Sequence, residues 1–163
     1  MQLAVIADTH IPTRAAAIPD RFEERIRAAD HVIHAGDFTS AEALEHVHDL
    51  ADELTAVHGN MDGRALELPA VASLVVEGVT VVVTHGTGSP SGYEDRVAGV
   101  AREEGGDDAV GVAGHTHTVL DTVVDGVRLL NPGSVTGAAP ADRATMMTVD
   151  VEDGALDVTV HEP

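Results

Sequence analysis

The sequence predicts an α/β fold, built as a two-sheet sandwich with a mixed first sheet and a largely antiparallel second sheet. As far as Val57, short apolar runs alternate with amphipathic stretches, which is typical of parallel strands joined by right-handed crossovers. Beyond that point, two-residue turns separate paired apolar runs, which indicates hairpins. A length of 163 residues with 44% apolar side chains suits a single domain over residues 1–163.

Three strands and two helices are expected in the first half. Leu3–Ala7 is a continuous apolar run, as in a strand that is buried on both faces. Pro19 and the acidic residues after it predict a helix start, and Ser40 can cap a second helix. The predicted strands cover residues 3–7, 31–34 and 54–57, and the predicted helices cover residues 19–27 and 40–50.

The second half is richer in strands. Glu77-Gly78, Asp125-Gly126 and Asp153-Gly154 are two-residue turn signals between strand-like runs. A helix is expected near residues 93–102 and a turn at 131–134. The predicted strands cover residues 71–76, 79–84, 110–113, 119–124, 127–130, 144–150 and 155–160.

The charge of the chain is strongly negative. Asp and Glu number 28 against 9 basic residues, all of them Arg, which gives a formal net charge of −19. Such a surface repels nucleic-acid backbones and anionic membranes. A Lys-free, acidic chain with a full apolar complement resembles proteins of salt-accumulating microbes, where dissolved ions screen the self-repulsion. The absence of Cys excludes disulfides, thiolate metal sites and cysteine nucleophiles.

No membrane or targeting segment is expected. The apolar run at residues 2–7 ends at Asp8, far short of a signal-peptide core or a spanning helix. We therefore expect a cytoplasmic protein.

Polar side chains appear where five of the predicted strands end. In open α/β sheets, ligands bind at the carboxyl ends of the strands, so these loops are expected to meet in one crevice. The side chains gathered there are two Asp, one Asn and four His: Asp8, His10, Asp37, Asn60, His85, His115 and His117.

These seven side chains offer oxygen and imidazole ligands without sulfur. Such a set suits Mn²⁺, Zn²⁺, Fe²⁺ or Ni²⁺ rather than Ca²⁺. Seven ligands, with one shared carboxylate, are enough for two metal ions that keep open positions for water. Two ions about 3.5–4 Å apart are the usual equipment for in-line attack on phosphorus.

The order Asp-x-His, Gly-Asp, Gly-Asn, His-Gly, Gly-His-x-His, from Asp8 to His117, resembles the calcineurin-like metallophosphoesterase superfamily. The similarity is greatest to its small single-domain phosphodiesterase branch, which also contains the retromer scaffold subunit. The resemblance implies a dinuclear metal-dependent phosphodiesterase that uses a metal-bridging hydroxide for in-line attack, with Mn²⁺ as the expected ion. Its substrate would be a small phosphodiester or phosphomonoester.

The resemblance also assigns roles to residues. It implies that Asp8, His10 and His117 hold the first metal ion. Asn60, His85 and His115 would hold the second ion, and Asp37 would bridge both. Asp37, Asn60 and His115 would be catalytic through the metal-bound hydroxide. Dimers are common in this branch, so a homo-oligomer is a further expectation.

One departure from the family pattern affects the chemistry. Many larger members have a His after Gly-Asn that protonates the leaving oxygen, whereas this chain has Met61. The small branch commonly lacks that His, so the change is compatible with an enzyme that prefers good leaving groups. Two alternatives stay open: a non-catalytic protein-interaction scaffold of the same fold, and a nuclease, against which the acidic surface argues.

Several other polar residues near these motifs are expected to be structural. We interpret His34 as buried beside the site or as a hydrogen-bond donor to a ligand. Asp62 either orients a ligand or serves its own turn, and Ser134 is a weak candidate for a phosphate contact. Arg14 is the basic residue nearest to a ligand loop in the sequence. The remaining histidines are interpreted as surface or structural residues: His31, His46, His48, His58 and His161.

Overall fold

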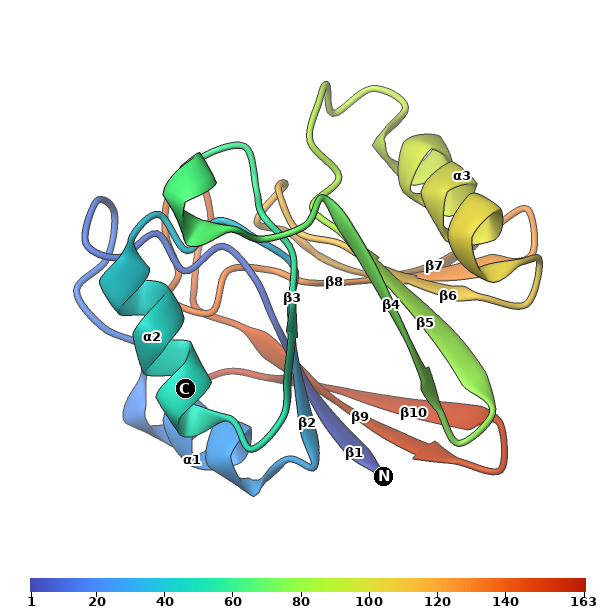
Figure 1. Ribbon diagram of the computed structural model, residues 1–163, viewed down its shortest axis with the longest axis horizontal. Helices are drawn as coiled ribbons and strands as arrows, with labels where there is room; N and C mark the ends of the chain where they lie inside the picture. The colour runs from blue at the N-terminus through green and yellow to red at the C-terminus, as the bar shows by residue number, and fades with distance from the viewer.

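The computed structural model describes residues 1–163 and shows two β-sheets packed face to face between two layers of helices (Figure 1). The first sheet has the strand order β10-β9-β1-β2-β3, and the second has the order β4-β5-β6-β8-β7. The predicted two-sheet α/β sandwich is therefore confirmed.

The first sheet is mixed, as predicted. β1 pairs in parallel with β2, and β2 with β3, whereas β9 pairs antiparallel with both β1 and β10. The C-terminal hairpin of β9 and β10 thus belongs to the same sheet as the N-terminal strand β1. The strands of this sheet are β1 (Gln2–Ile6), β2 (His31–His34), β3 (Leu54–Ala56), β9 (Met146–Glu152) and β10 (Ala155–His161).

The second sheet is also mixed, so the expectation of a largely antiparallel sheet is wrong in its centre. The outer pairs β4-β5 and β7-β8 are antiparallel hairpins, but β6 lies parallel to both β5 and β8. The physical reason is that α3 carries the chain from β5 back across the sheet before β6 begins, which gives a parallel crossover. Its strands are β4 (Val71–Val76), β5 (Val79–Thr84), β6 (Val110–Val112), β7 (Val119–Val124) and β8 (Val127–Pro132).

The helices cover the outer faces of the sandwich (Figure 1). α1 (Asp20–Ala28) and α2 (Ala41–Leu50) pack on the first sheet, whereas α3 (Tyr93–Gly105) packs on the second. The Ser40 hydroxyl accepts a hydrogen bond from the amide of Ala43 and so caps α2, as predicted. A short 3₁₀ helix, η1 (Arg64–Leu66), follows β3 and was not expected from the sequence.

Alternation along the strands divides the core into three layers. Leu3 and Val5 of β1 point between the sheets and pack against the second sheet, whereas Ala4 and Ile6 pack on the layer of α1 and α2. All four side chains are buried, which confirms the prediction that this strand is covered on both faces. β8 runs through Asn131 and Pro132, so part of the expected turn at 131–134 belongs to a strand.

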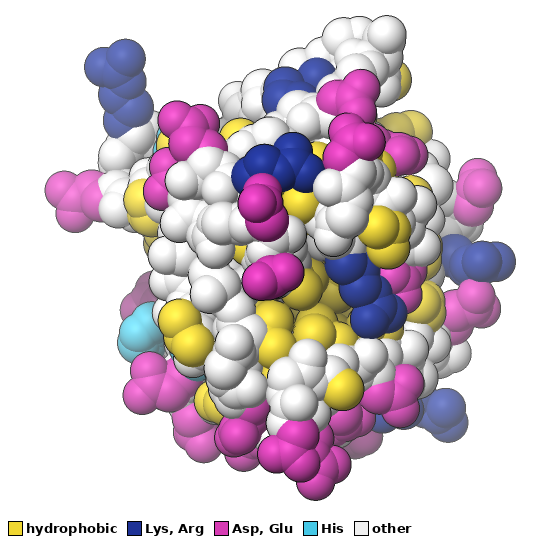
Figure 2. All heavy atoms as spheres, turned by 90° about the vertical axis from the view of Figure 1, so that its right-hand side faces the viewer, with side chains coloured by type: hydrophobic (Ala, Val, Ile, Leu, Met, Phe, Trp, Pro, Cys, Tyr) yellow, Lys and Arg dark blue, Asp and Glu magenta, His cyan; other side chains and the backbone are white.

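Figure 2 shows the side of the molecule on which α3 and the β4-β5 and β9-β10 hairpins end, with acidic side chains both above and below a central hollow of apolar side chains. The chain has only 9 basic residues but 28 acidic ones.

No helix is both long and apolar enough to cross a membrane.

Candidate metal centre

The seven predicted site residues all follow the carboxyl ends of parallel strands. Asp8 and His10 come after β1, Asp37 after β2 and Asn60 after β3, all in the first sheet. His85 follows β5 of the second sheet, and the segment containing His115 and His117 follows β6 of the same sheet. Hydrogen bonds join the two sheets here, because the amide of His115 donates to Asp8 Oδ2 over 3.0 Å.

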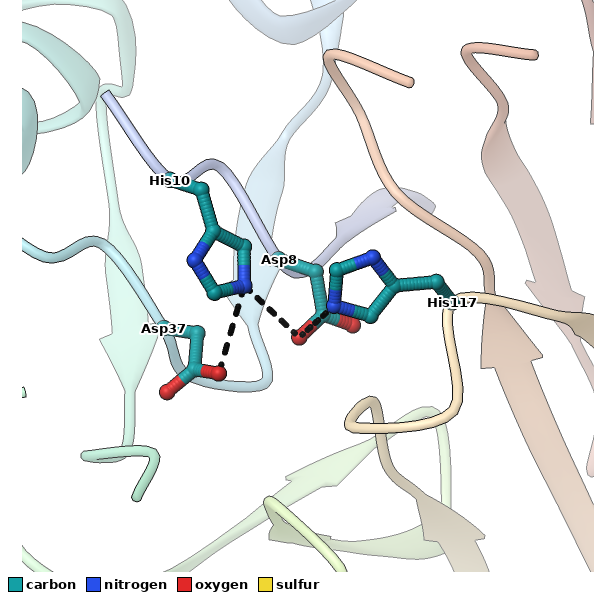
Figure 3. Close-up of side chains that lie close together, drawn as sticks. All are labelled: Asp8, His10, Asp37 and His117. Carbon is teal, nitrogen blue, oxygen red and sulfur yellow. Dashed lines mark ion pairs between the residues drawn. The ribbon is translucent and has the colours of Figure 1, made fainter. Parts of the chain in front are cut away.

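Four of these side chains converge on one point (Figure 3). The ligand atoms of Asp8, His10, Asp37 and His117 all lie within 4.8 Å of one another, and all four residues are buried. His10 Nε2 is 3.3 Å from Asp37 Oδ2 and 3.8 Å from Asp8 Oδ1, and His117 Nε2 is 3.4 Å from Asp8 Oδ1. The group contains the three residues that the family resemblance implies for the first metal ion, together with Asp37, the expected bridging carboxylate.

The other three side chains meet beside this group. Asn60 Oδ1 lies 3.0 Å from both His85 Nε2 and His115 Nδ1. His85 Nε2 is also 3.3 Å from Asp37 Oδ2. Asp37 Oδ2 therefore faces His10 on one side and His85 on the other, so the structure places it between the two predicted ligand sets.

Backbone carbonyls orient three of the imidazoles. His85 Nδ1 donates to the carbonyl of Ala35 over 2.6 Å, and His117 Nδ1 donates to that of Ala138 over 2.7 Å. His115 Nε2 donates to the carbonyl of Gly88 over 2.9 Å. A ring nitrogen that donates in this way leaves the lone pair of the other nitrogen free for a metal ion.

The buried polar atoms of the centre fit a cation. Asp8 Oδ1 and both ring nitrogens of His10 are buried and have no hydrogen-bond partner within the protein. Leaving buried polar atoms unpaired costs about 1–3 kcal/mol each. A divalent ion bound between the carboxylates and the imidazoles would satisfy Asp8 Oδ1 and one nitrogen of His10.

The charges of the centre favour the same conclusion. Burial lowers the pKa of His10, but the nearby carboxylates of Asp37 and Asp8 outweigh burial and raise this pKa to about 9. For Asp37, burial raises the pKa of the carboxyl, yet the neighbouring imidazoles of His10 and His85 hold this pKa well below its usual range. The two buried carboxylates are therefore stabilised by a neighbouring positive charge, which either a protonated imidazole or a metal ion can supply.

The backbone is strained at the same positions. Asp8, His10, Asp37, His115 and His117 all have positive φ angles, of 52°, 45°, 63°, 71° and 58°. Such angles are uncommon for residues other than glycine and cluster at functional sites. The sharp turns aim the side chains back over the strand ends.

Two glycines permit the close approach of these loops. Gly36 has a φ angle of 97°, and a Cβ there would lie 2.7 Å from the amide nitrogen of Gly59. A Cβ on Gly114 would lie 2.8 Å from Asp8 Oδ2. A side chain at either position would push the ligand loops apart.

The structure decides between the two interpretations of Asp62. Its carboxylate accepts hydrogen bonds from the amides of Asp37, Thr39 and Gly59, over 2.9, 2.8 and 2.8 Å. Asp62 therefore ties the loop after β2 to the loop after β3. It orients Asp37 through the backbone rather than serving only its own turn.

Three other sequence interpretations can be compared with the structure. His34 is buried beside the site, as predicted, and its Nε2 lies 2.7 Å from the Thr9 hydroxyl. The Ser134 hydroxyl is buried and donates to the carbonyl of Asp8, so it is structural. Arg14 donates to the carbonyl of Ala139, next to the residue that accepts from His117.

Sequence reasoning missed three residues that support the centre. The Tyr93 hydroxyl donates to the carbonyl of Gly114 over 2.7 Å, and Asn131 Nδ2 donates to the same carbonyl over 2.9 Å. Arg96 Nη2 donates to the carbonyls of Gly86 and Ser89. No local motif marks Tyr93 or Arg96, and the turn signal at 131–134 does not reveal that Asn131 contacts Gly114. For Arg96 the sequence offers one general signal: every Lys or Arg position of this acidic chain is an Arg, so each Arg is a candidate for a specific contact.

The chain belongs to the calcineurin-like phosphoesterase superfamily, whose domain model matches residues 1–154. It is 34% identical over 161 residues to a probable metallophosphoesterase of Methanothermobacter thermautotrophicus, with 98% of this chain and 91% of the relative covered. It is also 28% identical over 152 residues to a phosphodiesterase of Methanocaldococcus jannaschii, with 84% and 86% covered.

Among solved structures, the fold is similar to that of wild-type Vps29 of Entamoeba histolytica complexed with Zn²⁺. The TM-score is 0.80 at 26% identity, and the match covers 99% of both chains. The family resemblance read from the motifs is therefore confirmed.

Proposed function

We propose that this protein is a phosphodiesterase that works with two divalent metal ions, with Mn²⁺ as the expected ion. The observation that supports it is the arrangement of two nitrogen-and-oxygen ligand groups on either side of Asp37 Oδ2, which lies 3.3 Å from both His10 Nε2 and His85 Nε2. Asp8, His10, Asp37 and His117 would hold one ion. Asp37, Asn60, His85 and His115 would hold the other.

The two ligand groups would hold cations whose chemistry would be to activate a water nucleophile and to neutralise charge at phosphorus. The protein's own contribution is to fix the ligands before substrate arrives. Carbonyls of Ala35, Gly88 and Ala138 hold the imidazoles, and the amide of Met61 donates to Asp37 Oδ1 over 2.9 Å. Because the Met61 amide binds Asp37 Oδ1, Asp37 Oδ2 is the oxygen that faces the imidazoles. The proposed reaction requires no covalent modification of a side chain.

The leaving group receives little help from the protein at Met61. This side chain is 49% exposed, and a thioether cannot donate a proton. General acid catalysis is typically worth about 10²–10⁴-fold in rate. We therefore expect activated aryl esters to be cleaved much faster than alkyl esters.

The similarity to Vps29 supports a second candidate function, a protein-interaction scaffold. Against it, the predicted ligands are all brought together, and five of them adopt strained backbone angles that a scaffold has no need to maintain. A nuclease fits less well, because the net charge of −19 opposes a long nucleic-acid footprint.

The test is hydrolysis of bis(4-nitrophenyl) phosphate by the purified protein in concentrated KCl, with Mn²⁺ or Ni²⁺ added. We expect metal-stimulated turnover that a chelator stops. Asp37→Asn should cost more activity than any other single ligand change, because Asp37 lies between both ligand groups. The exposed Asp52→Asn variant is the matched control and should keep full activity.

Two results would favour the other candidates. A protein that binds the metal ions but shows no metal-stimulated turnover would favour the scaffold. Cleavage of single-stranded DNA at rates above those for the aryl diester would favour the nuclease.

A further inference from the structure

A cavity opens directly beside the metal centre. Its volume is about 360 Å³, and Asn60 and His85 form part of its wall. Apolar surface comes from Ala70, which directly precedes β4, and from Val97 and Val100 of α3. A volume near 300 Å³ or above is typical of small-molecule sites, and this cavity borders the predicted metal ligands Asn60 and His85.

The cavity is unusual for this protein because no carboxylate lines it. Four other hollows of comparable size each include at least one Asp or Glu: Glu45, Asp52 and Glu53 in one, Asp142 in another, Asp62 in a third, and Glu23 and Glu42 in the last. Because 28 of the 163 residues are acidic, a cavity wall without an acidic residue distinguishes this cavity from the other four. Its charged and titratable side chains are Arg96, His58 and His85.

Arg96 is fixed in the wall of this cavity. Its Nη2 donates to the carbonyls of Gly86 and Ser89, over 3.0 and 2.9 Å. Its Nε is buried and has no hydrogen-bond partner. A buried N–H without an acceptor is costly, and an arginine presents a flat, weakly hydrated cation that stacks well on planar groups.

We propose that this cavity is the subsite for one ester group of the phosphodiester, and that it selects a planar, apolar group of aryl size without positive charge. The inference rests on the proposed function, because the phosphate itself would have to lie at the metal centre. The apolar wall formed by Ala70, Val97 and Val100 accepts the ring face, and Arg96 repels cationic groups. Esters that carry a quaternary ammonium or amine group are therefore excluded as good substrates.

The test uses non-hydrolysable phosphonates with a common head group, measured by calorimetry on the Mn²⁺-loaded protein. Phenylphosphonate should bind at least about tenfold more tightly than methylphosphonate, because its ring is buried in the cavity. A cationic analogue, 4-(aminomethyl)phenylphosphonate, should bind more weakly than phenylphosphonate. The measurement is made in 2 M KCl, about the range where the net charge of the protein is screened.

Substitutions in the cavity wall test whether the tighter binding of phenylphosphonate arises in this cavity. Val100→Phe should fill the cavity and remove the advantage of phenylphosphonate while leaving the affinity for methylphosphonate unchanged. Val123→Phe, at a side chain that is 63% exposed on β7, is the matched control and should retain the advantage. Because Val100 also packs against the core of the second sheet, Ala70→Leu at an exposed position provides a second test from the opposite wall.

The outcomes separate this inference from the proposed function. If neither phosphonate binds the Mn²⁺-loaded protein, both are wrong. If both phosphonates bind with equal affinity, or if folded Val100→Phe and Ala70→Leu variants keep the phenyl advantage, the subsite is wrong and the metal centre stands. If the cationic analogue binds as tightly as phenylphosphonate, the charge selectivity is wrong.

Discussion

Asp62 illustrates how a residue outside the ligand set can control the centre. Its carboxylate accepts three backbone hydrogen bonds, from Asp37, Thr39 and Gly59, and so joins two loops that carry predicted ligands. Asp37 and Thr39 both have positive φ angles, of 63° and 74°. The bonds to Asp62 stabilise a conformation that the chain would not adopt alone.

Asp62→Ala should therefore weaken metal binding by about 10–100-fold, which is typical when a group that supports a ligand is lost. Asp62→Asn should weaken it less, because one amide oxygen can still accept from Asp37 and Gly59. Competition with a fluorescent chelator measures the affinity, and Asp52→Ala at an exposed position serves as the control. Equal metal affinities in the Asp62→Ala variant and the unchanged protein would contradict this role.

His34 makes the stability of the protein depend on pH. Burial, with the nearby His85 adding to it, lowers the pKa of His34 to about 3. In the unfolded chain this pKa is about 6.5, so below that pH the unfolded state binds a proton that the native state excludes. The unfolding free energy should consequently fall as the pH decreases from 6.5 towards 3.

In the metal-free protein, this effect should cost about 2 kcal/mol between pH 6.5 and 5. His34→Gln cannot take up the proton, yet its amide can still reach the Thr9 hydroxyl. Urea unfolding at both pH values measures the difference, and the variant should lose less stability than the unchanged protein. Identical losses in the two proteins would show that His34 does not titrate in this way.

At the scale of elements, α3 supports the centre through the loop at its N-terminal end. Arg96, on this helix, binds the carbonyls of Gly86 and Ser89, and the loop between them supplies the Gly88 carbonyl that accepts from His115 Nε2. The helix thus orients His115 without touching it. The segment at residues 86–89 serves as this link.

Arg96→Gln should release the loop and lower the occupancy of the second metal position more than that of the first. We expect about a 10–100-fold loss of affinity for the second ion, read from metal stoichiometry by mass spectrometry across a titration. Arg102→Gln changes an arginine on the same helix that binds Asp125 and Asp107 at the surface, and should retain two ions. Loss of both ions together in Arg96→Gln would instead indicate general unfolding of the centre.

The whole molecule carries a net charge of −19, and its self-repulsion should make stability depend on salt. The Debye length falls from about 10 Å at 0.1 M to about 3 Å at 1 M salt. If screening stabilises the fold by about 2 kcal/mol, the unfolding midpoint of a chain of this size rises by about 4–8 °C.

Differential scanning calorimetry in 0.1–3 M KCl measures this shift, and most of the gain should be complete by about 1 M. A midpoint that stays constant over this range would contradict the prediction. A gain that continues linearly to 3 M would indicate exclusion of salt from the surface rather than screening.

The strands and helices were largely predictable, because their signals are local. The continuous apolar run of β1, the Ser40 cap of α2 and the Glu77-Gly78 turn each act over a few residues. The parallel placement of β6 between β5 and β8 was not predictable from such signals. The position of β6 depends on the sheet to which the chain returns after α3. It depends also on the pairing of the β9-β10 hairpin with the first sheet rather than the second.

The family and the seven polar residues that follow the strands can be inferred from the sequence, since their order and residue types are properties of the chain. Which of their atoms face one another depends on how the two sheets pack. Asp37 Oδ2 lies between His10 and His85 because Met61 occupies the other oxygen, and Arg96 enters the site from a helix of the opposite layer. Such contacts arise from the packing of two sheets, and no local pattern of residues encodes them.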